Sequence, residues 1–219
     1  MSIANAAHCS MLGGEKALPY IPINGVRSDG KAYCALPGRI DASSGAFEAD
    51  FTITSTYSGD WHAFGAHGSS NNRAFFLLNL QRTGTAEATY VFGSFTSPSS
   101  GLRFMPGNRY LLSSGRNQSG YWATLNGSSV FDRILGDPVF NSGQFLIFRA
   151  SATNSQTNPQ ASSSPTFFVL HGLKVWYADT LVADLIPCRE IATAEVCFYN
   201  QIDGTFIKNV TSGSLIEVS

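Results

Sequence analysis

The stretch from 167 to 210 constrains this chain most, because its apolar residues recur at alternate positions, the period of a β-strand with one buried face. In the first half of the stretch they are Phe168, Leu170, Leu173, Val175 and Tyr177. Residues 178–180 interrupt the pattern and residues 181–186 resume it, which predicts a tight turn and a second strand. Pro187 has no N–H to donate to a neighbouring strand, so we expect it at a strand end or a sheet edge.

Turn signals elsewhere divide the chain into at least ten short strand candidates. Asp203-Gly204 and Asn126-Gly127 each separate two apolar runs and predict hairpins, because these dipeptides readily adopt positive φ. The remaining strand candidates are 47–54, 75–80, 90–95, 109–112, 120–125, 129–134 and 144–149. No convincing helix appears, although a short helix or 3₁₀ turn could fit within 132–142. The pattern predicts an all-β fold of two packed antiparallel sheets, a β-sandwich or barrel.

Two of these segments are distinctive. Residues 47–54 alternate strictly, which predicts a half-exposed strand, whereas 75–80 is apolar on both faces and should be a central strand. Between the strands, 151–165 is a polar run that is unusually long for a loop in a compact domain, so it is functional or disordered.

Length and charge limit the classes of function. A chain of 219 residues predicts one domain, which we place at 19–219. Its net charge of −1 gives no electrostatic basis for a nucleic-acid partner. No apolar run reaches the roughly 18 residues of a membrane span, so we expect no membrane insertion. The N-terminus resembles no secretory signal peptide, and we therefore expect synthesis in a cytoplasm.

The cysteines and the N-terminus leave alternatives open. Cys9, Cys34, Cys188 and Cys197 form no Cys-x-x-Cys pair, so we interpret them as small core residues or free thiols in preference to a disulfide such as Cys188–Cys197. Residues 1–18 are small, polar and unpatterned. They are either a flexible terminus or an arm that packs on a neighbouring subunit.

Glu48 and Asp50 are the one candidate for catalytic chemistry. They lie on the same face of a predicted strand, about 7 Å apart from the rise per residue, and glycosidases need a carboxylate pair. Retaining glucanases with a jelly-roll fold carry Glu-x-Asp-x-x-Glu on such a strand, but the last position here is Ile53. A solvated outer face explains the two carboxylates equally well, and we expect no enzyme activity.

Candidate glycan-binding residues gather around one further strand. An aromatic platform with nearby acid, amide or guanidinium groups suits a sugar, which has an apolar face and a polar edge. The candidates are Asp60, Trp61, His62, Asn72, Arg73 and, separately, Trp122. Alternatively, Trp61 packs at a sheet rim, and Trp122 and Trp176 are core or interface aromatics. No third ligand accompanies His62 and His67, so we expect neither a metal nor a cofactor.

The C-terminal segment carries one further pattern, formed by Lys174, Trp176, Leu181, Val182, Asp184, Leu185, Pro187, Tyr199, Asp203, Gly204 and Phe206. In these residues it resembles the concanavalin A-like (laminin-G-like) jelly-roll proteins of bacteriophage virions and prophages. Weaker matches are Tyr20-Ile21-Pro22, Gly25, Asp29-Gly30, Tyr33, Ile40-Asp41, 47–53 and Phe64-Gly65-Ala66. The sequence departs from the pattern at Asn200, where the family has Asp, and at 195–197, where it has Gly-Leu.

This resemblance implies a concanavalin A-like β-sandwich that serves as a non-catalytic virion structural protein. It would be a capsid decoration, a head fibre or a tail component, assembled from the host cytoplasm into the virion. The implied partners are other virion proteins and further copies of the chain, and the protein could contact host-surface glycans. A carbohydrate-binding receptor module is the alternative, and a glycan hydrolase is a second one. The fold alone does not decide among them.

Overall fold

The computed structural model describes residues 17–38, 45–55, 60–67, 75–81, 90–93, 104–117, 120–133, 144–149 and 164–219. Within these ranges every paired strand is antiparallel, and the strands form two sheets. The main path of the larger sheet runs β10 (Ser128–Arg133), β9 (Gly120–Leu125), β8 (Arg109–Asn117), β4 (Gly45–Ile53), β12 (Phe168–Tyr177), β13 (Thr180–Glu190), β14 (Val196–Asn200) and β15 (Thr205–Ile207).

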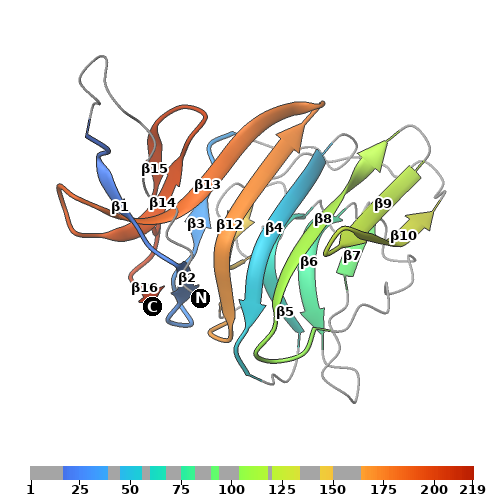
Figure 1. The fold of residues 1–219 in the computed structure, drawn as a ribbon, viewed down its shortest axis with the longest axis horizontal. Coiled ribbons are helices and arrows are strands. Elements are labelled where there is room, and N and C mark those ends of the chain that lie inside the picture. Colours follow the sequence, from blue (N-terminus) through green and yellow to red (C-terminus); the bar gives the residue numbers. More distant parts are fainter. Residues whose placement is uncertain are drawn as a thin grey trace, which may run out of the picture.

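Three short strands complete the larger sheet, and five others form the smaller one. β1 (Tyr20–Pro22) pairs with β13, β2 (Gly25–Ser28) pairs with β12, and β16 (Leu215–Val218) pairs with β2. The smaller sheet runs β3 (Cys34–Ala35), β11 (Leu146–Ile147), β5 (Asp60–His67), β6 (Phe75–Gln81) and β7 (Tyr90–Gly93). Figure 1 shows β5, β6 and β7 lying behind β4 and β8, so the two sheets are stacked as layers.

Phenylalanine side chains fill the space between the two sheets. Phe47 of β4 meets Phe64 of β5 edge to face, with ring centroids 4.9 Å apart. Phe51 stacks on Phe168 at 5.0 Å and meets Phe104 edge to face at 5.1 Å. Such rings combine a large apolar area with favourable quadrupole geometry. The structure therefore confirms the all-β class, a two-sheet antiparallel β-sandwich.

The alternation expected along residues 47–54 is confirmed in β4. Phe47, Ala49, Phe51 and Ile53 are fully buried, while the residues between them are partly exposed. Because side chains of a strand alternate between its faces, the intervening residues point out of the sandwich. This outer face of the larger sheet is turned toward the viewer in Figure 1.

Two tight turns set the register of the strands that carry the outer face. Asn126 and Gly127 have φ of 50° and 81°, as the Asn-Gly signal predicts for the hairpin between β9 and β10. Ala178 and Asp179 have φ of 47° and 61° and join β12 to β13 in the same way. Left-handed φ at both central residues matches the twist of the flanking strands.

The final hairpin expected around Asp203-Gly204 is confirmed as β14 and β15, and Gly204 has a φ of 74°. Asn200, which stands where the resembled family has Asp, has a defined role at this hairpin. The buried Asn200 side chain accepts hydrogen bonds at Oδ1 from the backbone N–H of Asp184 at 3.0 Å and of Ile202 at 3.3 Å. A side-chain oxygen is what these amides need, and Asn supplies it as Asp would.

Pro187 does not lie at a strand end, which corrects that part of its prediction, because β13 continues through it to Glu190. At this point β13 exchanges one neighbour for another. It pairs with β12 as far as Leu185 and with β1 from Cys188 onward. The Pro187 carbonyl accepts a hydrogen bond from Ile23 N–H at 3.1 Å on that side. The missing N–H therefore falls where no continuous partner strand exists to receive it.

Two further strand predictions are corrected. The buried strand expected at 144–149 is paired only over Leu146–Ile147, because Phe148 takes a left-handed φ of 66° and ends it. Tyr177, expected on the buried face, is 37% exposed, because β12 ends there and the chain turns. Residues 134–142 and 151–163, which include most of the expected short helix and of the long polar loop, lie outside the described residues.

The three described cysteines are core residues, as expected. Cys34, Cys188 and Cys197 are fully buried free thiols. Cys188 and Cys197 lie opposite each other on β13 and β14, with their sulfur atoms 3.6 Å apart. The hydrogen bond with Cys197 and burial raise the pKa of the Cys188 thiol well above its ordinary value. Cys9 and residues 1–16 of the expected arm lie outside the described residues.

In the part of the chain that the structure covers, there is no helix with the length and apolar character of a transmembrane span.

Replacing Phe51 with alanine tests the aromatic core. Phe51→Ala removes contacts to Phe104, Tyr110 and Phe168, so we expect it to lower the free energy of unfolding by about 3–5 kcal/mol. Leu111→Ala is the matched control, because Leu111 is 41% exposed on the outer face of neighbouring β8, and it should cost less than about 1 kcal/mol. Urea unfolding measures both values. Equal losses would contradict this assignment of the core.

Candidate functional site

Two tryptophans and two small residues form one row across the outer face of the larger sheet. Trp122 of β9 lies opposite Gly115 of β8, Gly115 lies opposite Ala46 of β4, and Ala46 lies opposite Trp176 of β12. Neighbouring strands are about 4.8 Å apart, so the row brings four strands together that are distant in sequence. The two central positions carry little or no side chain, which leaves room for an indole ring to lie over the sheet.

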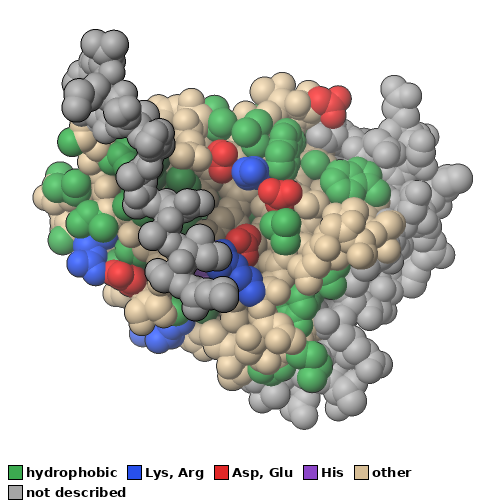
Figure 2. Space-filling model, viewed as in Figure 1, with side chains coloured by type: hydrophobic (Ala, Val, Ile, Leu, Met, Phe, Trp, Pro, Cys, Tyr) green, Lys and Arg blue, Asp and Glu red, His purple; other side chains and the backbone are tan. Residues whose placement is uncertain are grey.

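This row opens into a pocket of about 400 Å³. Its lining residues are Ala46, Phe47, Glu48, Ser113, Trp122, Trp176 and Asp179. Figure 2 shows the same face, where acidic and basic side chains alternate over the middle of the sheet beside hydrophobic ones. A concave site with aromatic walls and a few polar groups is the usual form of a small-ligand site.

Gly115 determines how Trp122 can lie on the sheet. A Cβ atom at this glycine would be 2.6 Å from Cβ of Ala46 and 3.0 Å from Cζ2 of Trp122. The first distance is shorter than real Cβ contacts and the second is tighter than most of them, so the indole occupies the space that a side chain at position 115 would take. The floor and one wall of the pocket therefore depend on the absence of a side chain there.

The next row of the face supplies the polar edge of the pocket. Ser113, Glu48 and Lys174 lie opposite one another on β8, β4 and β12. Ser113 Oγ donates to Glu48 Oε2 at 3.2 Å, and Lys174 Nζ lies 3.5 Å from Glu48 Oε1. These contacts hold the Glu48 carboxylate at the edge while leaving it about one-third exposed. Asp179 adds a second carboxylate from the turn between β12 and β13.

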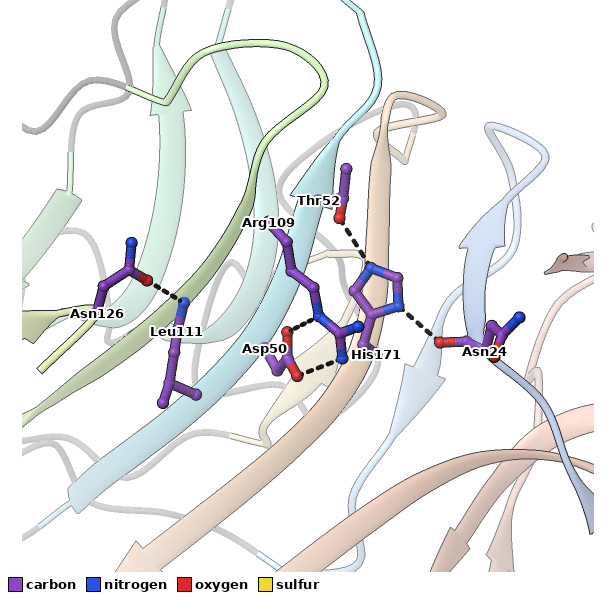
Figure 3. A network of polar contacts seen from close by, with 7 residues as sticks. All are labelled: Asn24, Asp50, Thr52, Arg109, Leu111, Asn126 and His171. Carbon is purple, nitrogen blue, oxygen red and sulfur yellow. Dashed lines mark hydrogen bonds and ion pairs between the residues drawn. The ribbon is translucent and has the colours of Figure 1, made fainter. Parts of the chain in front are cut away.

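A second polar network lies lower on the same face, and Figure 3 shows it from close by. Arg109 donates from Nε to Asp50 Oδ1 at 2.7 Å and from Nη2 to Oδ2 at 2.6 Å, a bidentate ion pair. The hydrogen bonds that Arg109 donates to Asp50 raise the pKa of the Arg109 guanidinium above its ordinary value. The sequence-derived carboxylate pair is thus divided, because Asp50 is paired with Arg109 and Glu48 with Lys174.

His171 belongs to this network as a structural residue. It stands at an irregularity in the pairing of β12 with β4, where the register shifts between Leu170 and Gly172. Its Nδ1 donates to the Asn24 carbonyl oxygen at 2.6 Å, because a carbonyl oxygen can only accept, and its Nε2 is hydrogen-bonded to Thr52 Oγ1 at 2.8 Å. Both ring nitrogens are occupied, and the ring ties β4 and β12 to the chain before β2.

The residues singled out from the sequence are not all brought together. Trp122 lies on the larger sheet in the pocket, partly buried. Asp60, Trp61 and His62 lie at the start of β5 in the smaller sheet, where the structure describes the backbone and not these side chains. Asn72 and Arg73 lie outside the described residues. The candidate site on β5 therefore stays a prediction.

Five pocket residues were not assigned to a site from the sequence: Ala46, Phe47, Ser113, Trp176 and Asp179. A signal for Trp176 was present, because the buried Leu173 and Val175 place residues 174 and 176 on the opposite, outer face. No such signal existed for Ser113 or Asp179. Their proximity to Trp122 follows from the order of the strands in the sheet, which cannot be read from the sequence. Among the described side chains, no three His, Cys, Asp or Glu residues are arranged to hold a metal.

Comparison with known proteins gives no family. No protein-family model matches the sequence, and no curated protein matches it. Two solved structures of Trypanosoma rangeli sialidase share a distant likeness. The complex with sialic acid has 12% identity and a TM-score of 0.43, covering 62% of this chain and 21% of that one. The covalent intermediate with 2,3-difluorosialic acid has 11% identity and a TM-score of 0.44. The match covers 73% of this chain and 31% of that one.

Gly115→Ala tests the construction of the pocket. The added methyl group would collide with Ala46 and the Trp122 ring, so we expect a loss of about 1–3 kcal/mol in the free energy of unfolding and a changed near-UV tryptophan signal. Gly172→Ala is the matched control on the same sheet. Its Cβ would meet nothing closer than the Leu185 carbonyl oxygen at 3.8 Å, so both readouts should stay unchanged. If Gly115→Ala changes neither the free energy of unfolding nor the near-UV signal, the close contact with Trp122 is contradicted.

Proposed function

We propose that this chain is a non-catalytic protein that binds carbohydrate in the pocket between Trp122 and Trp176. The observation that carries the proposal is one pocket of about 400 Å³ with an indole on either side and hydrogen-bonding groups along its edge. A sugar ring matches this composition, because its C–H face stacks on an aromatic ring while its hydroxyl groups need polar partners.

The polar edge suits hydroxyl groups in particular. Glu48 and Asp179 can accept hydrogen bonds from hydroxyl groups, and the Ser113 hydroxyl can both donate and accept. Carboxylates make charge-assisted hydrogen bonds, which are stronger than neutral ones. Lys174 and Ser113 hold Glu48 in place before a ligand arrives, which lowers the entropic cost of binding.

The ion pairs on this face support binding over hydrolysis. An inverting glycosidase needs one carboxylate to activate a water molecule, but both oxygens of Asp50 accept from the Arg109 guanidinium. The position of the third glucanase carboxylate is Ile53, whose side chain points into the core. Glu48 and Asp179 remain as ligand-contacting groups.

The C-terminal signature supports a biological setting for the binding. The segment that resembles phage concanavalin A-like proteins forms β12 to β15, and β12 carries Trp176 and Lys174 of the site. We propose that the chain is a structural component of a virion, a capsid decoration, head fibre or tail component, and that the pocket contacts host-surface glycans. Other virion proteins and copies of this chain are then its assembly partners.

Replacement of each tryptophan tests carbohydrate binding. On a glycan array and on whole bacterial cells, Trp122→Ala and Trp176→Ala should each weaken binding by roughly tenfold or more, about 1.4 kcal/mol, because each removes a stacking surface. Trp61→Ala is the matched control, since Trp61 is the third tryptophan of the chain and lies on the other sheet. Thermal unfolding shows whether each variant is folded.

Two outcomes would contradict this site. Loss of binding in Trp61→Ala alone would move the site to β5 and the residues around it. If the intact protein binds no glycan and no cell, the carbohydrate proposal itself fails.

The virion setting has its own measurement. Mass spectrometry of purified phage particles, or of particles induced from a prophage that encodes this chain, should recover it at a fixed copy number relative to the major capsid protein. Recovery from the host lysate without any in the particles would reject the virion role and leave sugar binding untouched.

A further inference from the structure

The charges around the pocket are unbalanced. Two carboxylates, Glu48 and Asp179, line it, and its described lining contains no lysine or arginine. Among the described residues, Lys174 contacts the pocket lining through its ion pair with Glu48. The tryptophan rings add to the negative character, because the face of an indole carries the negative lobe of its quadrupole.

Lys174 does not restore neutrality, because it stands between two carboxylates. On β12 it lies opposite Glu48 of β4 on one side and opposite Asp184 of β13 on the other. Glu48 is the ion-pair partner of Lys174, and Asp184 on β13 and Asp179 at the turn add two further carboxylates to this part of the face.

Arg109 of β8 is a cation on the lower part of this face, and its guanidinium is already paired with Asp50. Both Nε and Nη2 of its guanidinium are bound to Asp50 in a bidentate pair. It lies opposite Thr52, whereas the pocket lies around Ala46 and Glu48 of the same strand. A ligand in the pocket therefore meets carboxylates and indole faces, and none of the described residues that line the pocket is a lysine or arginine.

We propose that the pocket selects sugars by charge, accepting neutral and ammonium-bearing sugars and excluding carboxylated and sulfated ones. This inference rests on the carbohydrate binding proposed above and adds the class of ligand. A sugar carboxylate or sulfate would face Glu48 and Asp179 with like charge, which raises the energy of the complex. A protonated amino group would gain from the same carboxylates and from the indole faces through cation–π attraction.

Matched glycosides separate charge from stereochemistry in the test. The probes are immobilised glucose, glucuronic acid and glucosamine, and the corresponding galactose, galacturonic acid and galactosamine, presented at equal density. Within the series that binds, we expect the amino sugar to bind at least as well as the neutral sugar. The uronic acid should bind about fivefold or more weakly, the size of a single partly exposed charge contact. Raising NaCl from about 0.05 M to about 0.5 M should narrow these differences.

Charge-removing variants locate the effect in the pocket. Glu48→Gln and Asp179→Asn keep the shape and should each reduce the discrimination against the uronic acid. Lys174→Gln should increase the discrimination, because Glu48 then lacks its ammonium partner. Asp203→Asn is the matched control, since it removes an exposed carboxylate on the distant β14–β15 turn and should leave the ratio of affinities unchanged.

The outcomes distinguish this inference from the proposed function. Preferential binding of uronic acids, with Trp122→Ala abolishing it, would overturn the charge selection and keep the sugar site. A ratio that Glu48→Gln and Asp179→Asn do not change would also overturn it. Absence of binding to a broad glycan array and to cells would instead reject the sugar site, and the inference with it.

Discussion

The aromatic contacts that β4 makes across the core hold the two sheets together and fix the outer face as well. Phe47 meets Phe64 of the smaller sheet, and Phe51 stacks on Phe168 of the neighbouring strand. Because side chains alternate along a strand, burying these rings forces Ala46, Glu48 and Asp50 outward. A slip of one residue would exchange the two sets, so the core specifies the register on which the pocket depends.

The pocket results from small residues as much as from large ones. Ala46 lines the pocket between the strands that carry Trp122 and Trp176, and the Trp122 ring lies in the space that a side chain at Gly115 would fill. A Cβ atom added at position 115 would lie 3.0 Å from the Trp122 ring, so the position of the indole depends on glycine there. A row of this kind leaves indole surface open to solvent, which folding alone does not favour and which a ligand would cover.

Ion pairs divide the outer face into two regions with different chemistry. In the lower region the guanidinium of Arg109 and the ring of His171 use their polar atoms within the protein, and so they brace β4, β8 and β12. In the upper region carboxylates outnumber the ammonium of Lys174 and remain open to the pocket. The first arrangement stabilises the sheet, whereas the second leaves acceptors available to a ligand, and this contrast underlies both proposals made above.

The sequence by itself determined the strands, their faces and several turns. The alternation in 47–54 predicted β4, and Asn126-Gly127 and Asp203-Gly204 predicted their hairpins, because burial period and backbone φ preference are local properties. Its errors also have local causes: Pro187 is tolerated inside β13 at a change of partner strand, and Phe148 leaves the strand region. The tertiary structure alone decided which outward residues meet. Trp122 and Trp176 are 54 positions apart in the chain, and they flank one pocket because β8 and β4 pair between β9 and β12. Strand order depends on long-range packing, and no local pattern encodes it.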